Sequence, residues 1–257
     1  MRIATFNCNS IRVRLPAILA WLEKYSPDLL ALQETKVRDK DFPRDEIAAG
    51  GWHVVYCGEK SYNGVAIIGK REPDEFSFGL EDDDGGSNTR LVRVKIGGLT
   101  VVNTYIPHGR ALDSEMFDFK LAWFGRLRAY FGKRFAGGGN DLVWVGDLNV
   151  ARLPMDVYDS KAVWPHVCHC REVIDAFDAV VGWGFEDVFR RHIREAGAYT
   201  FWDYRQRGAL ERNRGWRIDH ILAAGPIAGR SVGCRVDIEP RRAERPSDHT
   251  FVFADFA

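Results

Sequence analysis

Short apolar runs bounded by turn residues recur along the whole chain and predict a protein built largely from β-strands. The predicted strands cover residues 3–6, 29–32, 54–56, 65–68, 91–96, 100–104, 142–145, 218–222 and 251–254. Apolar residues at helical spacing predict helices over residues 15–23, 114–131 and 171–181. Turns such as Gly97-Gly98 join neighbouring strands and favour antiparallel pairing. The pattern therefore predicts an α/β protein with one mixed sheet or two.

Two glycine-containing stretches, residues 81–88 and 136–140, are predicted to be loops. Both are short and lead directly into strand patterns, so neither is typical of a linker between domains. A chain of 257 residues with 46% apolar residues can bury a large core. We therefore expect a single domain over residues 1–257. The acidic run Asp82-Asp83-Asp84 in the first loop is interpreted as solvated carboxylates rather than as a metal site.

Composition restricts where the protein works and what it binds. No apolar run approaches the roughly 18 residues of a membrane span, and residues 1–7 lack the apolar core of a signal peptide. The five cysteines are odd in number and mostly scattered, which favours reduced thiols and a cytoplasmic protein. The 36 basic and 36 acidic residues cancel, so any site for a polyanion must be local.

Acidic and amide side chains follow several predicted strands at the points where the strands end. They occur in Asn7-Cys8-Asn9, Gln33-Glu34-Thr35-Lys36, Tyr105 to Gly109, Gly146 to Asn149 and Pro246 to His249, and Asp219 lies among apolar residues. Each segment alone has a structural explanation, because Asp, Asn and Ser favour turns and caps. Strand ends that converge on one crevice would instead bring these groups together.

A convergence of these carboxylates would require compensating cations. Burying Glu34, Asp147, Asp219 and Asp248 together costs several kcal/mol per ion unless a divalent metal or paired His and Lys side chains compensate. Oxygen and amide ligands, without a His or Cys set at zinc spacing, favour Mg²⁺ or Mn²⁺. Such a cation polarises a phosphoryl oxygen while a carboxylate or imidazole activates water, which is the chemistry of phosphodiester hydrolysis. Pairing with a buried Asp would raise the pKa of His249 and hold it as a cation facing phosphate.

Six segments in this order carry a resemblance to a known family. They are Phe6 to Arg12, Pro27 to Lys36, Asn63 to Ala66, Gly146 to Ala151, Asn213 to Asp219 and Ser247 to His249. With them, nearly the whole chain resembles the exonuclease III family of apurinic/apyrimidinic endonucleases, within the endonuclease/exonuclease/phosphatase superfamily related to DNase I. Gly-Asp-x-Asn and Ser-Asp-His indicate only the superfamily. Gln-Glu-Thr-Lys together with Asn-x-Gly-x-Arg-Ile-Asp indicates its DNA-repair branch.

The resemblance implies a fold and a metal site. The fold is a four-layer α/β/β/α sandwich of two mixed, mostly antiparallel sheets, with the site at one end between the sheets. Glu34 is implied as the main metal ligand, with Asn7 and Asp248 as further ligands. Asn9 and Lys36 are implied to support this site, Lys36 by neutralising local charge.

The resemblance also implies catalytic roles. Asp147 would orient or activate the attacking water, and Asn149 would hold that water or the scissile phosphate. Asp219 would pair with His249, and Tyr105 would contact the phosphate.

Damage recognition in the resembled family uses a small apolar pocket that accepts a baseless sugar flipped out of the helix. The matching positions are Phe201, Trp216 and Ile218. Flipping costs least where pairing and stacking are already lost, which favours abasic sites. The alternative is that Phe201 and Trp216 are core aromatics. Flanking polar and basic residues, including Arg205 and Arg214, favour a surface rim that contacts DNA instead.

Basic residues concentrate late in the chain. Between residues 190 and 245 there are thirteen arginines and seven acidic residues. A protein of zero net charge can therefore present one positive face to DNA phosphates. The expected partner is double-stranded DNA with abasic or 3′-blocked lesions, bound by a monomer.

Three positions depart from the family pattern without removing a proposed ligand, namely Ser10, Val188 and Thr250. The segment from Trp164 to Cys170 lies where the family varies. Its His and Cys residues are too close together for an ordinary tetrahedral zinc site, so its role stays open.

These observations predict a Mg²⁺- or Mn²⁺-dependent DNA-repair nuclease that cleaves 5′ to abasic sites and removes 3′ nucleotides or blocking groups. A superfamily phosphatase or phosphodiesterase on inositol phosphates or phospholipid head groups shares this chemistry, but needs a small-ligand or membrane-facing rim. A catalytically silent DNA-binding module would lose ligands, whereas every proposed ligand is present. The sequence leaves open the balance of endonuclease and exonuclease activity, the number of metal ions, tolerance of uracil or RNA, and the oligomeric state.

Overall fold

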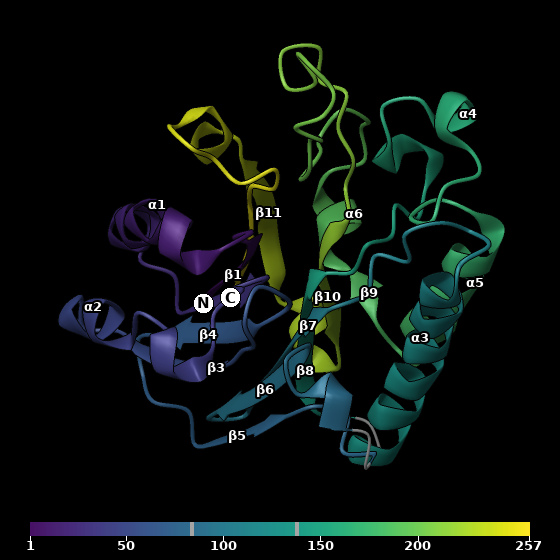
Figure 1. Ribbon diagram of the computed structural model, residues 1–257. Helices are drawn as coiled ribbons and strands as arrows, with labels where there is room; N and C mark the ends of the chain where they lie inside the picture. Colours follow the sequence, from purple (N-terminus) through teal and green to yellow (C-terminus); the bar gives the residue numbers. More distant parts are fainter. Residues whose placement is uncertain (83–84, 137–138) are drawn as a thin grey trace.

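Twelve strands form two sheets in the computed structural model, which describes residues 1–82, 85–136 and 139–257 (Figure 1). They are β1 (Arg2–Asn7), β2 (Leu29–Gln33), β3 (His53–Cys57), β4 (Val65–Gly69), β5 (Glu75–Phe78), β6 (Leu91–Ile96), β7 (Leu99–Tyr105), β8 (Asp141–Asp147), β9 (Glu186–Asp187), β10 (Asp219–Ala224), β11 (Ser231–Asp237) and β12 (Phe251–Phe256). One sheet has the order β11-β12-β1-β2-β4-β3, and the other has the order β5-β6-β7-β8-β10-β9.

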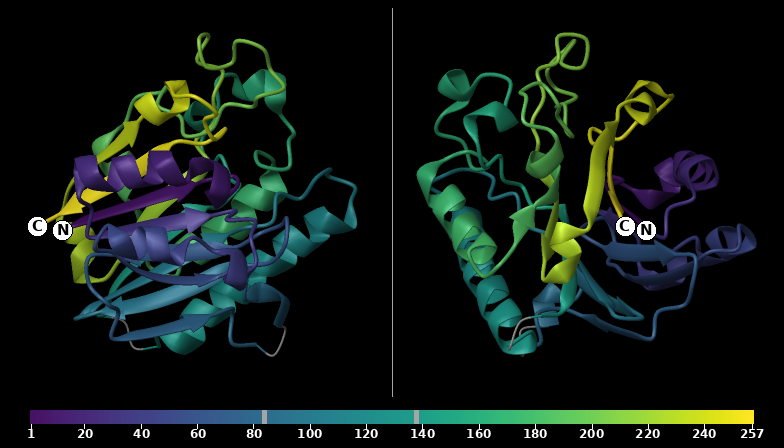
Figure 2. Two further views of the ribbon diagram at one scale, coloured as in Figure 1. Left: turned by 60° about the vertical axis from the view of Figure 1, so that its left-hand side comes forward. Right: turned by 180° about the vertical axis from the view of Figure 1, so that it is seen from behind.

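Helices cover the outer faces of both sheets. The α-helices are α1 (Ile11–Tyr25), α2 (Arg44–Ala49), α3 (Glu115–Arg134), α4 (Ser160–Val163), α5 (Arg171–Val181), α6 (Val188–His192) and α7 (Pro226–Gly229). Short 3-10 helices span Asp39–Asp41, Gly85–Ser87, Pro154–Asp156 and Glu239–Arg242. Helices α1 and α2 lie outside the first sheet, and α3 and α5 lie outside the second (Figures 1 and 2). This arrangement confirms the predicted four-layer α/β/β/α sandwich.

Strand pairing brings several predicted site residues to one end of the sandwich. Both sheets are mixed, because β1–β2 and β7–β8 pair in parallel and the other neighbours pair antiparallel. Asp147, the last residue of β8, lies opposite both Tyr105 of β7 and Asp219 of β10. Three distant segments therefore end at the same edge of the second sheet.

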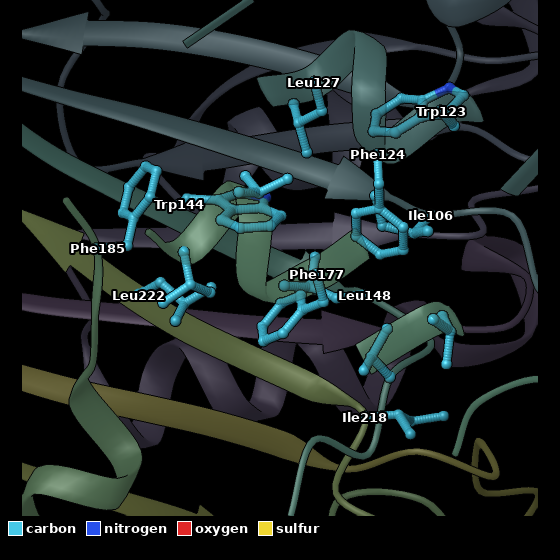
Figure 3. Packing of buried hydrophobic residues seen from close by; sticks show 14 of the residues in the cluster. Ile106, Trp123, Phe124, Leu127, Trp144, Leu148, Phe177, Phe185, Ile218 and Leu222 are labelled. Carbon is cyan, nitrogen blue, oxygen red and sulfur yellow. The ribbon is translucent and has the colours of Figure 1, made fainter. Parts of the chain in front are cut away.

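Three apolar clusters hold the layers together. Ile3, Val143 and Val252 belong to the cluster between the sheets, and a stack of aromatic rings that includes Trp21 and Phe251 packs α1 onto the first sheet. The third cluster fills the space between the second sheet and helices α3 and α5, as Figure 3 shows at close range. Ile218 and Leu148 carry this cluster to the end of the sandwich where Asp147 lies.

The structure contains all the predicted strands and helices, and it adds others. β5 and β11 lie at sheet edges, where one face can stay exposed and the apolar signal is weak. The register of β11 also shifts between Ser231 and Gly233. The strand predicted over residues 218–222 begins one residue later, at Asp219. No helix within the described ranges is both long enough and apolar enough to cross a bilayer.

The acidic run in the first predicted loop is only partly described. Asp82 forms an ion pair with Arg126 of α3. Asp83 and Asp84, like residues 137–138 of the second predicted loop, lie outside the described residues.

Candidate active site

A cavity of about 470 Å³ opens at the end of the sandwich where β7 and β8 end. Most of the predicted site residues line it, namely Glu34, Tyr105, Asp147, Asn149, Phe201, Arg205, Trp216, Ile218, Asp248 and His249. Asn7, Asn9 and Asp219 are hydrogen-bonded to residues of this lining, and Lys36 forms an ion pair with Glu34. Arg214 is not part of the lining, and its guanidinium lies over the ring of Tyr158. The sequence thus predicted a set of residues that meet in space.

Asn7 holds two of the carboxylates together. Its amide nitrogen donates to Glu34 Oε1 and to Asp147 Oδ2, both at 2.8 Å. Its oxygen accepts from the main-chain N–H of Asn9 at 3.0 Å. The side chain was expected to offer oxygen to a metal, whereas here its nitrogen faces the carboxylates. In this arrangement Asn7 spaces Glu34 and Asp147 by donating to both.

A chain of polar contacts links Glu34 to Asp248. Lys36 Nζ lies 2.7 Å from Glu34 Oε2 and donates to Asn9 Oδ1 at 2.6 Å. Asn9 Nδ2 in turn donates to Asp248 Oδ1 at 2.9 Å. Burial would raise the pKa of Glu34, but Lys36 and the hydrogen bonds from Lys36 and Asn7 outweigh it and lower that pKa. Glu34 is therefore held as a carboxylate at the cavity.

The predicted pairing of Asp219 with His249 is present. His249 Nδ1 lies 2.8 Å from Asp219 Oδ2, and its Nε2 lies 3.7 Å from Asp147 Oδ2. Burial lowers the pKa of His249, but the charges of Asp219 and Asp147 outweigh burial and raise it. Burial is also the main reason that the pKa of Asp147 is raised. The site thus combines a stabilised imidazolium with a carboxylate able to take up a proton.

The end of β8 fixes Asn149 beside Asp147. The main-chain N–H of Asn149 donates to Asp147 Oδ1 at 3.0 Å, and its Nδ2 donates to the carbonyl of Ile106 at 3.0 Å. Its backbone is left-handed, with φ of 50°, a conformation that Asn tolerates better than most residues. The Cys168 thiol donates to Asn149 Oδ1, with Sγ at 3.7 Å. One hydrogen of the Asn149 amide is therefore left to donate into the cavity.

The donor set fits a hard divalent cation. Glu34, Asp147 and Asp248 present carboxylate oxygens to one cavity, and such ligands suit Mg²⁺ and Mn²⁺. Asp147, Asp219 and His249 also place one ligand atom each within 4.8 Å of one another. His249 is a poor ligand there, because a protonated imidazole has no free lone pair. Asp219 Oδ1 is buried without a hydrogen-bond partner in the described residues, which leaves negative charge to be compensated.

The predicted apolar pocket forms one wall of the cavity. The Phe201 ring lies 4.9 Å from the His249 ring, and the Trp216 ring lies 4.8 Å from the His166 ring, centroid to centroid. Trp216 is 7% exposed and belongs to the core cluster while also lining the cavity. Trp216 is therefore both a core aromatic and part of the cavity wall, with its buried chain neighbour Arg217 paired to Asp156.

The positive face is smaller than the arginine count predicted. Arg190, Arg217 and Arg241 are buried or nearly so and serve internal contacts. Arg205, at the cavity, is exposed and pairs with Asp203 at 2.8 Å. Sequence alone does not distinguish an arginine that faces solvent from one that pairs inside the fold.

Some cavity residues were not among those predicted. His108, His166 and Cys168 also line the cavity, and Lys120 of α3 reaches its back wall. His108 follows a predicted strand, which was a usable signal. Lys120 interrupts the apolar face of the helix predicted over residues 114–131, which was a second one.

Comparison with known proteins identifies the family. The sequence matches the Endonuclease/Exonuclease/phosphatase family over residues 4–249. The chain belongs to this family. Within the family, exodeoxyribonuclease III of Haemophilus influenzae is 32% identical over 268 residues, which cover 100% of both chains.

Two solved structures in the family are similar over the full length. An AP endonuclease from Archaeoglobus fulgidus is 45% identical with a TM-score of 0.96, over 100% of this chain and 99% of its own. A 3′ phosphatase from Neisseria bound to a product DNA hairpin is 38% identical with a TM-score of 0.93, over the same shares. These similarities confirm the DNase I-like fold and the resemblance to the exonuclease III branch.

Proposed function

We propose that this DNA-repair nuclease hydrolyses the phosphodiester 5′ to abasic sites in double-stranded DNA and also removes 3′ nucleotides or 3′ blocking groups. One observation carries the proposal. Residues as distant in sequence as Glu34, Asp147 and His249 meet in one cavity together with an apolar wall. Carboxylates, an imidazolium and an amide at one point match the needs of phosphodiester hydrolysis.

The cofactor of the proposed reaction is Mg²⁺ or Mn²⁺. Glu34 and Asp248 would hold the cation, with Asn7 after rotation of its amide group. Bound there, the cation supplies polarisation of the phosphoryl oxygen and stabilisation of charge on the leaving oxygen. Lys36 would keep Glu34 ionised and in place, as its contact with Glu34 Oε2 supports.

The remaining roles fall to side chains around Asp147. Asp147 takes the proton of the attacking water, and the high pKa that burial gives it suits this task. His249, held by Asp219, donates from Nε2 toward a phosphate oxygen as an imidazolium. Asn149 and Tyr105 contact the same phosphate from the ends of β8 and β7.

Lesion recognition would use the apolar wall and the basic rim. Phe201, Trp216 and Ile218 accept a flipped abasic sugar, which lacks the base that would collide with this wall. Arg205 and Arg214 contact DNA phosphates, and binding therefore weakens as salt rises.

We also propose that residues 1–257 act as one catalytic domain and as a monomer in the cytoplasm. Five free cysteines support the cytoplasmic location.

The test uses labelled duplexes that differ in one feature, an abasic analogue, a 3′-phosphate or neither, each with Mg²⁺ and with EDTA. We expect Mg²⁺-dependent incision 5′ to the analogue and removal of the 3′-phosphate. Asp147→Asn should lower kcat by a factor of about 10³ or more, because the amide cannot accept the proton. The matched control is Asp175→Asn, an exposed residue of α5, which should leave kcat unchanged.

Two results would contradict the proposal. One is incision at equal rate in EDTA. The other is hydrolysis of an inositol phosphate by a preparation that is inert toward all three duplexes, which would establish the superfamily phosphatase alternative.

A further inference from the structure

Lys120 of α3 joins three loops behind the cavity. Its ammonium nitrogen donates to the main-chain carbonyls of Asn149 at 2.7 Å, Val167 at 2.7 Å and His108 at 3.1 Å. The three carbonyls belong to the loop after β7, the loop after β8 and the segment before α5. Each of these loops contributes lining to the cavity. The Lys120 side chain thus connects three loops of the site that are distant from one another in the sequence.

Burying the ammonium group of Lys120 costs free energy, because the charge loses its contact with water. Lys120 has no exposed surface and lies on the apolar face of α3 between Phe117 and Phe124. No carboxylate of the described residues lies within ion-pair distance of its nitrogen. The Cys168 thiol is in contact with it, with Sγ 3.9 Å from Nζ. Burial accordingly lowers the pKa of Lys120. The three carbonyl acceptors offset part of the free-energy cost of burying this cation.

The hydrogen bond from Lys120 to the Asn149 carbonyl helps to fix the backbone of Asn149. Its backbone is left-handed, a conformation that costs free energy and must be supported by its surroundings. Its N–H is fixed by Asp147, its side-chain nitrogen by Ile106 and its carbonyl by Lys120. Loss of Lys120 would leave that carbonyl buried without a partner and free the peptide plane to rotate.

We propose that Lys120 is a positioning residue that sets the Asn149 side chain for contact with the phosphate by gathering the three loops through their carbonyls. Lys120 acts through Asn149 and does not touch the DNA, since none of its surface is exposed. The inference rests on the proposed role of Asn149 in hydrolysis.

A double-mutant cycle between Lys120→Met and Asn149→Ala tests this coupling on whichever duplex the wild type cleaves fastest. Lys120→Met should lower kcat by about 10- to 100-fold, with KM and the affinity for uncleaved duplex in EDTA changed by less than about 3-fold. In the Asn149→Ala background the same substitution should lower kcat by less than about 3-fold, because no placed side chain remains to be lost. Lys120→Gln, which keeps donors on a shorter side chain, should lie between wild type and Lys120→Met.

Amide hydrogen exchange supplies a readout that does not depend on activity. Lys120→Met should speed exchange in peptides that cover residues 147–151 and 166–169. The matched control is Arg93→Met, which removes another buried cation, one that pairs with Glu75 in β5. It should lower stability while leaving kcat and exchange in these two peptides unchanged. Should Lys120→Met not fold, Lys120→Gln enters the cycle and the exchange experiment with the same criteria.

Several outcomes would overturn the inference. Fully multiplicative losses in the cycle would show that Lys120 and Asn149 act independently. A lower melting temperature with unchanged kcat per folded molecule would make Lys120 part of the scaffold only, and a change in KM alone would make it a determinant of DNA binding. If no duplex is cleaved at all, the proposed function fails, while hydrogen exchange still decides whether Lys120 fixes the loops.

Discussion

Arg217 lies directly behind the cavity wall and has no exposed surface. Its guanidinium contacts Asp156 and Asp187 at 2.8 Å each, while its chain neighbours Trp216 and Ile218 line the cavity. Burial would raise the pKa of each carboxyl, but Arg217 outweighs burial and lowers both. The ion pairs therefore hold the segment that carries the apolar wall.

Replacing this arginine should change how stability depends on pH. In the wild type the lowered pKa values of Asp156 and Asp187 stabilise the fold above about pH 3.9, the unfolded value, and this contribution is lost as pH falls through the folded values. In Arg217→Met, burial of Asp187 is opposed only by His220 and by the main-chain N–H of Arg190, so the pKa of Asp187 should rise. We expect a loss of about 3–5 kcal/mol at pH 7 in urea unfolding, and a smaller loss at pH 5 than at pH 8.

An exposed pair provides the control for this prediction. Arg171→Met removes an ion pair with Asp175 on the surface of α5 and should change stability by less than about 0.5 kcal/mol. A loss for Arg217→Met that is equal at pH 5 and pH 8 would contradict the assigned charge states.

At the scale of single residues, the sequence predicted which residues belong to the site. It did not predict how their side chains are oriented. The partner of His249 was predicted as Asp219 from the family likeness, and the structure has that pair. The direction of the Asn7 amide depends on Glu34, Asp147 and Asn9, which arrive from other parts of the chain. No local pattern at Asn7 contains that information.

At the scale of elements, the end of β8 requires a glycine. Gly146 has φ of 140°, and a Cβ built there would lie 1.9 Å from the carbonyl oxygen of Thr104. Thr104 and Gly146 are direct partners in the parallel pairing of β7 and β8. Because Gly146 has no side chain, β7 and β8 can lie close together next to Asp147.

Gly146→Ala should therefore damage both fold and activity. We expect a loss of about 2–4 kcal/mol in the free energy of unfolding, because main-chain atoms on both strands must move. The kcat per folded molecule should fall as well, because Asp147 is the next residue.

Another glycine in a helix serves as the control. Gly125→Ala in α3 meets no atom within 4 Å and should be neutral or stabilising by up to about 1 kcal/mol. Equal effects of the two substitutions would contradict the close approach of β7 and β8.

Elements with a clear period were predictable, whereas of the edge strands in the described residues only β3 was predicted. Helix α3 follows from its apolar spacing, and β8 follows from a continuous apolar run. β9 has two residues and forms only because β10 offers a partner. Its existence is a property of the sheet rather than of its own sequence.

At the scale of the whole molecule, folding concentrates negative charge at one end of the sandwich. Glu34 comes from the first sheet, Asp147 and Asp219 from the second, and Asp248 from the segment before β12. The sheets pack through an apolar cluster that excludes water between them. The architecture therefore holds carboxylates near one another at a cost that cations relieve.

Divalent metal should consequently stabilise the fold. A ligand that binds only the folded protein adds about 2.7 kcal/mol at 100 times its Kd, which for a chain of this size is a rise of roughly 5 °C or more in Tm. We expect this rise when Mg²⁺ or Mn²⁺ is added to EDTA-treated protein and its reversal by excess EDTA, measured by thermal unfolding. Glu34→Gln should remove most of the shift.

Controls separate site binding from screening of surface charge. KCl at the same ionic strength should not reproduce the shift, and Asp175→Asn should retain it. A shift of equal size in Glu34→Gln would place the metal elsewhere.

The sequence by itself determined the residue types of the site, the main strands and helices, and the family. Periodicity and short motifs are local, so each can be recognised within a short stretch of sequence. The tertiary structure decided which arginines are buried, how Asn7 is turned, that Trp216 belongs to both core and cavity, and that Lys120 reaches the loops of the site. These features depend on packing between segments that are distant in the chain, so no window of sequence contains both partners.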